Sequence, residues 1–483
     1  MHVIIAAALA AMLAGAYSLT LHLNIYSKFL VLAIALLLLA GISLRRLIGH
    51  QPEYGFLAVA LICGSLLSIS APNDYNSWDE QIHYRRAELI ASHIAPSMYV
   101  RPGKIPFSYS LQQQENNNAL VSSSYRPRRK HLDLNLSYAS IGYFPSAIAL
   151  ALGSKTHVPY WIVYIFGRWI NVVLFSFVVF FGIRKLKSGK MIMSVVALFP
   201  TSIYLASCYN YDSWVTAFSM LGMGYLFSEI QQPEKTITIS EASILIGAFV
   251  IGFGPKAIYF PLMFLLLFIK PDKFKCYKYY VRFRLATTLS IALVISSFLV
   301  PLVLSGFGSG DPRGGAAVNS TEQVNFILSE PVAYAKVLFR FVYNYINPLH
   351  APGYVTFFAF QGRVAGFWLV CITLAFTVLT DNINYGSSTA NWKIKASVVG
   401  VCLSTVALIA TAIYISFNPV RSPGIAGVQP RYLIPLVFPI VYIIGSKRIK
   451  LTINKSIYNS VAFAIMAVVL MRGIWDLMIS RYY

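Results

Sequence analysis

The sequence is dominated by long apolar runs that recur along all 483 residues. Most of these runs are roughly 16 to 25 residues long, and about 20 apolar residues let a helix cross the ~30 Å hydrocarbon core of a bilayer. Segments of about ten residues with alternating polarity, which would indicate an outer-membrane barrel, are absent. The sequence therefore predicts an all-α fold, a polytopic transmembrane helical bundle.

The composition agrees with this fold class, because the chain is 57% hydrophobic and only 12% charged. A single soluble core could not bury so much apolar surface, so a large part of it must face lipid. We expect residues 1–483 to form a single membrane-embedded domain.

About thirteen apolar runs are candidate membrane spans. They are residues 3–22, 26–44, 54–72, 159–183, 191–206, 213–230, 239–254, 257–270, 285–305, 363–381, 395–416, 431–446 and 456–477. The first run has no basic segment before it and a second run follows closely, which favours a retained anchor over a cleaved signal peptide.

The formal net charge of +22 would suit nucleic-acid binding, but most Lys and Arg residues form short clusters between apolar runs. This is the positive-inside pattern of membrane proteins, so no nucleic-acid partner is expected. One topology places all five clusters in the cytoplasm, with the N-terminus inside and the C-terminus outside. The clusters are residues 45–46, 184–190, 270–284, 393–395 and 447–455.

Residues 138–153 are apolar but short. Counting them as a full crossing would place the basic cluster at 184–190 outside. We therefore expect a re-entrant or interfacial helix there, surrounded by protein wherever its backbone enters the membrane.

Three outer loops are long in this topology, at residues 73–137, 306–335 and 417–430. The first is the largest, should contain juxtamembrane helices, and carries a basic patch that includes Arg126, Arg128 and Arg129. The second is Gly-rich at its start and is expected to be flexible, either as a lid or as a plain connector.

Acidic residues are scarce, seventeen in all, and two of them stand together just beyond the third apolar run. Asp79 and Glu80 are followed by His83 and Arg86 within two helical turns. A carboxylate in such a partly dry, aromatic setting could deprotonate a hydroxyl group. The alternative is an interfacial anchor in which Asp caps a helix and the acids pair with Arg. The same side chains offer oxygen and imidazole ligands, so a divalent metal such as Mg²⁺ or Mn²⁺ is possible but not required.

Two further outer ends carry polar residues. Tyr209, Asn210 and Asp212 lie between two apolar runs, where Asp212 could also be a simple helix cap. Lys256 interrupts an apolar stretch, and Arg431 with Tyr432 begins another. Ionisable residues at membrane depth usually face a cavity or a partner, although snorkelling of Lys and Arg near helix ends is an alternative.

Together these residues would place carboxylates, cations and aromatic rings around one outer cavity. Cations suit a phosphate group, and aromatic and amide groups suit sugar rings. An adjoining apolar groove would suit a polyprenyl tail, so the indicated ligand is a lipid-linked phosphosugar.

Five segments, in order, resemble a bacterial family of uncharacterised polytopic membrane proteins that is itself similar to GT-C glycosyltransferases. They are WDEQIHYRRAELIA, YFPSAIALALG, LFPTSIYLASCYNYDSW, GPKAIYFPL and GVQPRYLIPL. The resemblance covers about residues 50–445 and implies a GT-C-like bundle with a large first extracytoplasmic loop and a polyprenyl-phosphate sugar donor. The segment Tyr143–Ala147 has a single proline and no histidine, unlike the His-Pro-Pro motif frequent in better-known GT-C enzymes.

The resemblance also implies roles for particular residues. Asp79 matches the catalytic base and Glu80 its partner. Asn210, Asp212, Lys256 and Arg431 match later motifs. Lys256 and Arg431 would hold the donor phosphate, and Asp212 would orient the acceptor or Asp79.

The leading hypothesis is a glycosyltransferase of the bacterial inner membrane, acting on the periplasmic face. It would move a sugar from undecaprenyl phosphate to a hydroxyl of a surface glycan such as the O-antigen of lipopolysaccharide. A partner transferase and a flippase would supply the donor. One alternative is an O-antigen polymerase that uses outer-loop arginines such as Arg126, Arg128, Arg129, Arg313 and Arg421. Another is a lipid-linked-sugar transporter or flippase, which would place ionisable residues near the bilayer midplane.

Overall fold

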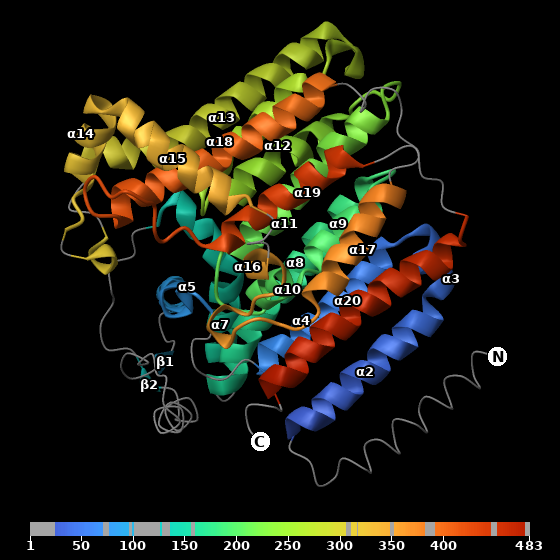
Figure 1. Cartoon of the computed structure of the whole chain (residues 1–483). Coiled ribbons are helices and arrows are strands. Elements are labelled where there is room, and N and C mark those ends of the chain that lie inside the picture. Colours follow the sequence, from blue (N-terminus) through green and yellow to red (C-terminus); the bar gives the residue numbers. More distant parts are fainter. Residues whose placement is uncertain are drawn as a thin grey trace.

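The computed structural model is a bundle of helices (Figure 1). It describes residues 25–70, 77–95, 99–100, 126–127, 136–155, 160–305, 311–315, 317–347, 352–381, 392–445 and 452–478. The predicted span at 3–22 lies outside the described residues, as do Arg128, Arg129 and most of the first outer loop.

Four of the described helices are long and apolar enough to cross a membrane by length and composition. They are α8 (Tyr160–Lys185), α13 (Tyr277–Ser305), α18 (Trp392–Phe417) and α20 (Lys455–Met478). Shorter apolar elements run beside them. These are α2 (Ile25–Ser43), α4 (Glu53–Ser70), α12 (Ile239–Phe253), η2 (Ala257–Phe268), α17 (Phe367–Thr380) and α19 (Ile434–Ile444).

The bundle is organised around α8, which packs against α4, α7 (Phe144–Lys155) and α11 (Asp212–Gln231). Glycines allow α8 and α11 to approach closely, because a Cβ atom on Gly224 would lie 2.5 Å from the carbonyl oxygen of Gly182. Small residues serve this purpose between membrane helices. Phe175 and Val179 of α8 are fully buried in the resulting core.

Two of the predicted spans are not single α-helices. The first is interrupted between α9 (Lys190–Ala197) and α10 (Pro200–Ala206), where Pro200 cannot continue the hydrogen-bonding pattern of the preceding helix. The second is η2, twelve residues of 3₁₀-helix with Pro261 inside it. At about 2.0 Å per residue it reaches roughly 24 Å, further than an α-helix of equal length.

The basic clusters predicted to be cytoplasmic gather at one end of the bundle. Lys190 Nζ lies 3.0 Å from Glu53 Oε2, and the amide of Met191 donates to Asp381 Oδ2 at 2.6 Å. At this end α3 (Arg45–His50) also packs on α20. These contacts bring the segments at Arg45–His50, Lys190 and Asp381 to one end of the bundle. That this end is cytoplasmic stays a prediction.

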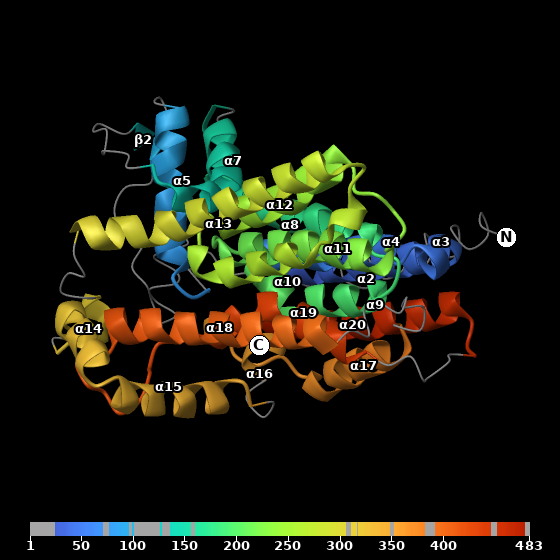
Figure 2. The same ribbon diagram turned by 90° about the horizontal axis from the view of Figure 1, so that it is seen from above.

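Helices α5 (Glu80–Ile94) and α7 lie side by side, across the direction of the long helices (Figure 2). Helix α7 follows η1 (Tyr138–Tyr143) and has twelve residues. The helix expected at 138–153 is therefore present as η1 and α7. Its position relative to the membrane stays a prediction. Two short strands, β1 (Tyr99–Val100) and β2 (Arg126–Pro127), pair antiparallel.

The second outer loop differs from the flexible segment expected at 306–335. It contains η4 (Pro312–Gly314), α14 (Ser320–Ser329) and the start of α15 (Pro331–Tyr345). Helix α14 begins where the side chain of Asn319 accepts a hydrogen bond from the amide of Glu322, and α15 begins with Pro331 at its first position. Both helices pack on α18. The remaining elements are η3 (Pro271–Lys273), α16 (Pro352–Val355), η6 (Ala359–Gln361) and η8 (Pro430–Leu433).

Candidate functional site

Six charged side chains from five elements meet at one end of the bundle. They lie at the starts of α5 and α11, just before η2, in and before η4, and in η8. The six are Asp79, Asp212, Lys256, Asp311, Arg313 and Arg431. We call them the outer cluster. The opposite end, with Lys190, Glu53 and Asp381, is called the lysine-rich end.

Asp79 is held in an uncommon backbone conformation directly before α5. Its φ is 59°, in the left-handed region, which Asp tolerates better than most residues. Its Oδ1 accepts a hydrogen bond from Arg313 Nη1 at 2.8 Å, and its Oδ2 lies 3.6 Å from Arg431 Nη2. Its side chain is 30% exposed, so an incoming molecule can reach the carboxylate. Residues kept in such conformations by their surroundings concentrate at functional sites.

Asp212 begins α11 and connects two cations. Its Oδ1 accepts a hydrogen bond from Lys256 Nζ at 3.0 Å, and its Oδ2 lies 2.7 Å from Arg431 Nε. A carboxylate in the first turn also interacts favourably with the helix dipole. Arg431 therefore lies between the two carboxylates of Asp79 and Asp212.

Arg431 is buried but keeps unused hydrogen-bonding capacity. The residue is 4% exposed, yet its Nε and Nη1 have no hydrogen-bond partner among the described residues. The 2.7 Å approach to Asp212 is an ion pair without hydrogen-bond geometry. Unsatisfied buried donors are costly, and a guanidinium can satisfy them by binding phosphate through two parallel hydrogen bonds. The cluster thus presents donors that suit an anionic ligand.

Aromatic rings surround these charges. The Lys256 ammonium lies 3.3 Å from the centroid of the Tyr432 ring, and the Arg431 guanidinium lies 4.8 Å from the Trp78 ring. The Tyr211 ring meets the His83 ring edge to face, with 4.8 Å between centroids. Cation–π contacts stabilise the two cations where water is scarce.

His83 lies one turn into α5 and faces the outer cluster. Its Nδ1 is 2.9 Å from the hydroxyl of Tyr143. Burial lowers the pKa of His83 to about 4, while nearby Asp212 acts to raise it and nearby Arg431 to lower it. The imidazole is therefore neutral near pH 7, when it can share a hydrogen bond with Tyr143. Arg86 follows one turn later on α5 and is half-buried.

Glu80 has different surroundings from Asp79. Its carboxylate is fully buried, and its Oε1 accepts hydrogen bonds from Arg168 Nε and from the amide of Tyr209, both at 2.9 Å. The amide of Ser77 donates to Oε2 at 3.2 Å. These contacts anchor the start of α5 to α8 and to the turn before α11. They assign Glu80 to positioning, so we do not retain it as a reacting group.

Two other predicted binding residues, Tyr209 and Asn210, make hydrogen bonds that stabilise the fold. The hydroxyl of Tyr209 donates to the carbonyl of Tyr164 at 2.8 Å, and the Asn210 side chain accepts from the amide of Ser213 at 3.0 Å. Both residues are almost fully buried. They shape the turn that presents Asp212 and do not themselves face the outer cluster.

Within the described residues, no three His, Cys, Asp or Glu side chains lie close enough together to hold a metal ion. The set of Asp79, Glu80 and His83 is divided because Glu80 points toward Arg168. The carboxylates of Asp79 and Asp212 have Arg and Lys neighbours instead.

Sequence reasoning did not assign two residues that matter here. Arg168 is completely buried in the middle of α8, and an arginine inside an apolar run is itself a signal for a buried acidic partner. Arg313 appeared only among the arginines of the polymerase alternative. Its contact with Asp79 spans 234 positions of sequence, which no local pattern reveals.

The comparisons with known proteins are few. No curated protein and no solved structure matches the chain. The model of a family described as predicted membrane protein (DUF2142) matches residues 61–440, which include the whole outer cluster. The chain therefore belongs to the DUF2142 family of predicted membrane proteins.

Proposed function

We propose that this protein is a GT-C-like glycosyltransferase of the bacterial inner membrane, with about thirteen spans and its active site on the periplasmic face. The donor is a sugar linked to a polyprenyl phosphate such as undecaprenyl phosphate. The acceptor is a hydroxyl of a surface glycan such as O-antigen.

One observation carries this proposal. A partly exposed carboxylate, Asp79, lies beside a buried arginine, Arg431, that has unused hydrogen-bond donors. A transferase that uses a lipid-phosphate donor needs this combination, because one group must accept a proton while another stabilises a phosphate leaving group.

In the proposed complex the donor phosphate binds among Arg431, Lys256 and Arg313. Arg431 offers its free Nε and Nη1, and Lys256 offers an ammonium held over the Tyr432 ring. Arg313 is 58% exposed and hydrogen-bonded to Asp79, so it can move to the phosphate at little cost. Its departure frees the Asp79 carboxylate for the acceptor.

Transfer then proceeds by a single displacement. The acceptor oxygen attacks the anomeric carbon, and its proton passes to the Asp79 carboxylate. The bond between the anomeric carbon and the phosphate oxygen breaks, and its electron pair leaves with the polyprenyl phosphate. The configuration at the anomeric carbon inverts, and the cations stabilise the charge that develops on the phosphate.

The polymerase alternative depends on arginines in two outer loops. Of these, Arg313 contacts the outer cluster, whereas Arg421 pairs with Glu330 at 2.5 Å and is 63% exposed. The structure does not describe the side chain of Arg126, nor Arg128 and Arg129 at all. The described contacts favour a carboxylate mechanism over a pair of arginine loops.

The transporter alternative would require a route through the bundle. Apart from the buried pair of Arg168 and Glu80, most of the described ion pairs lie instead at its two ends. The end opposite the outer cluster has ion pairs that link α8, α11 and α12. This arrangement favours chemistry at one face.

The test is complementation of a deletion strain with wild type or Asp79→Asn, followed by mass spectrometry of the released surface glycan. A general base typically contributes about 10²–10⁴-fold to rate, so we expect Asp79→Asn to abolish one sugar addition while chain length is retained. Asp476→Asn is the matched control, since Asp476 pairs with Arg472 on α20, far along the sequence from every cluster residue.

Full rescue by Asp79→Asn would refute its role as the base. Glycans shortened to single repeat units in the deletion strain would instead support the polymerase.

A further inference from the structure

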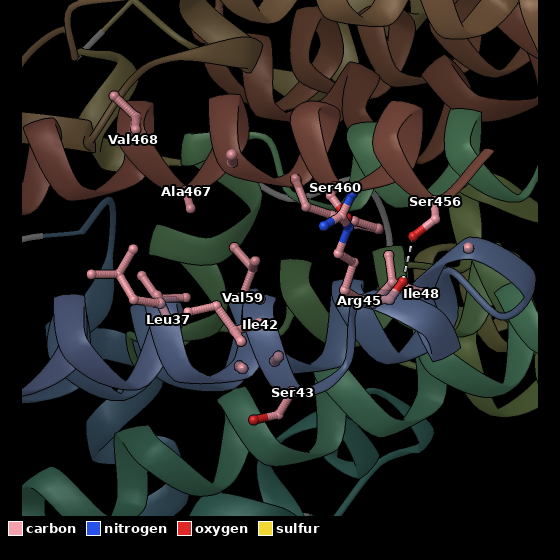
Figure 3. Close-up of a pocket in the computed structure, with 18 of the residues that line it drawn as sticks. Leu37, Ile42, Ser43, Arg45, Ile48, Val59, Ser456, Ser460, Ala467 and Val468 are labelled. Carbon is pink, nitrogen blue, oxygen red and sulfur yellow. Dashed lines mark hydrogen bonds between the residues drawn. The ribbon is translucent and has the colours of Figure 1, made fainter. Parts of the chain in front are cut away.

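Away from the outer cluster, a cavity of about 1510 Å³ opens between α2, α3, α4 and α20 (Figure 3). Pockets for drug-sized ligands measure about 300–1,000 Å³, so this cavity suits a larger molecule. None of the outer-cluster residues lines it.

Most of the cavity wall is apolar. Leu38 and Ile42 of α2 and Val468 of α20 line it and are exposed, so hydrocarbon can contact both walls. Gly41 widens this part, since a Cβ atom placed on it would meet nothing within 4 Å. An apolar channel between membrane helices fits an acyl chain.

The end of the cavity at the α2–α3 junction is basic. Arg45, Arg46 and Lys455 line it, and all three are exposed. Figure 3 shows the Arg45 side chain crossing the gap from α3 toward Ser460 of α20. The carbonyl of Arg45 accepts a hydrogen bond from the Ser456 hydroxyl at 2.6 Å, which fixes this residue beside α20.

Arg45, Arg46 and Lys455 form no ion pair among the described residues. An acidic influence on Lys455 comes from Asp381 through a Coulombic interaction. None of the described lining residues is acidic, and the neighbouring Glu53 is paired with Lys190. Arg472, which also lines the cavity, is paired with Asp476 further along α20. The Ser460 hydroxyl has no hydrogen-bond partner among the described residues, so it too can donate to a ligand.

We propose that this cavity binds an anionic glycerophospholipid. Its phosphate lies among Arg45, Arg46 and Lys455, and one acyl chain lies between α2 and α20. Basic pockets between membrane helices on the cytoplasmic side bind such headgroups, and the predicted topology puts this end there. A zwitterionic lipid fits less well, because three cations without an ion-pair partner among the described residues repel its ammonium group. The proposal does not depend on the proposed glycosyltransferase activity.

The headgroup is tested by native mass spectrometry of the purified full-length protein titrated with phosphatidylglycerol or phosphatidylcholine. We expect one phosphatidylglycerol to bind at least about tenfold more tightly than phosphatidylcholine, and this preference to disappear in R45Q/R46Q/K455Q. The matched control is K275Q/K278Q/R282Q, which removes three exposed cations near the start of α13 and should bind like wild type. Equal binding of both lipids by the wild type, or unchanged binding by the first triple variant, would overturn the proposal.

The acyl chain is tested with Gly41→Phe, at a position where an added Cβ atom meets nothing within 4 Å, so that the ring occupies part of the channel. We expect it to weaken phosphatidylglycerol binding at least severalfold while the melting temperature in detergent stays unchanged. Gly400→Phe on α18, where a Cβ atom also meets nothing within 4 Å, is the control. Unchanged binding by Gly41→Phe, or equally tight binding of glycerol phosphate that lacks acyl chains, would show that no acyl chain occupies the channel.

Discussion

The two ends of the bundle each hold a cluster of acids and cations, but the clusters use their charges differently. At the lysine-rich end Glu229 is buried and pairs with Lys185, Lys235 and Lys273 at 3.1 to 3.3 Å. Lys273 also donates to the carbonyl of Gln232 at 2.6 Å. We call this the inner cluster. Its charges are matched by partners from the surrounding helices.

The outer cluster leaves part of its capacity unused. Arg431 keeps two nitrogens without hydrogen bonds, and the carboxylate of Asp79 remains partly exposed. Its contact with Arg313 is made by an exposed side chain that can exchange partners. The comparison indicates that the inner cluster holds helices together, whereas the outer cluster is arranged to receive a ligand.

The largest expected effect on stability is that of Glu229→Gln. Removing this carboxylate leaves the buried ammonium of Lys273 without its ion-pair partner, whereas Lys185 and Lys235 keep Glu241. Breaking a buried pair typically costs about 3–5 kcal/mol. We expect a marked loss of thermal stability in detergent, while transfer per folded molecule is unchanged. Glu234→Gln, an exposed neighbour, is the control. A stable but inactive Glu229→Gln protein would contradict a purely structural role for the inner cluster.

Arg431→Lys tests whether the outer cluster binds the donor phosphate. Lysine keeps the positive charge but lacks the planar fork that can bind a phosphate through two nitrogens. We expect transfer to fall by about 10- to 100-fold, equivalent to roughly 1.4 to 2.7 kcal/mol, mainly through a higher KM for the lipid donor. The assay is a donor titration in proteoliposomes, with Arg472→Lys as the control. An unchanged KM would show that the Arg431 guanidinium is not needed for donor binding.

His83 should make the stability of the folded protein depend on pH. Its pKa is about 4 in the folded protein, against an ordinary value near 6.5, so the unfolded chain takes up more protons between these pH values. This contribution to stability is present above pH 6.5 and is lost as the pH falls toward 4. At pH 5 the loss is on the order of 1–2 kcal/mol.

The groups that influence His83 are Asp212, Arg431, Asp79 and Lys256. We expect the stability advantage of wild type over His83→Gln to shrink on acidification, as measured by melting temperatures from pH 7 to 5. His93→Gln on the same helix is the control. A constant difference between wild type and His83→Gln would contradict a buried neutral imidazole.

The smallest expected effect is that of Arg313→Gln. Exposed ion pairs contribute about 0–1 kcal/mol, so we expect a decrease of less than about fivefold in transfer and no change in melting temperature. The loss should diminish at high salt, which screens exposed charges. Arg421→Gln, whose partner is Glu330, is the control. A loss as large as that of Arg431→Lys would mean that Arg313 is essential for binding or chemistry.

Much of the candidate site could be predicted from the sequence. Asp79, His83, Asp212, Lys256 and Arg431 each stand where an apolar run begins or ends on the predicted outer side. Charged side chains are costly at such depths unless they meet one another, so their position alone indicates a shared site. The structure places all five in contact or close proximity.

The sequence could not separate Asp79 from Glu80. Neighbouring positions at a helix start are turned by about 100° from each other, and only the tertiary packing decides which one faces the bundle. Here the partner of Glu80 is Arg168, 88 positions away. The helices α14 and α15 were also not foreseen, because a Gly-rich beginning masked the capping signals at Asn319 and Pro331.

The position of Arg431 between Asp79 and Asp212 has a consequence for biosynthesis. Asp79 enters the membrane system early in translation, whereas Arg431 is supplied by η8, just before the penultimate helix of the described chain. The two carboxylates cannot acquire their shared guanidinium until the chain has been inserted as far as Arg431. Chains that stop before η8 would therefore lack a complete outer cluster, however well their earlier helices had assembled.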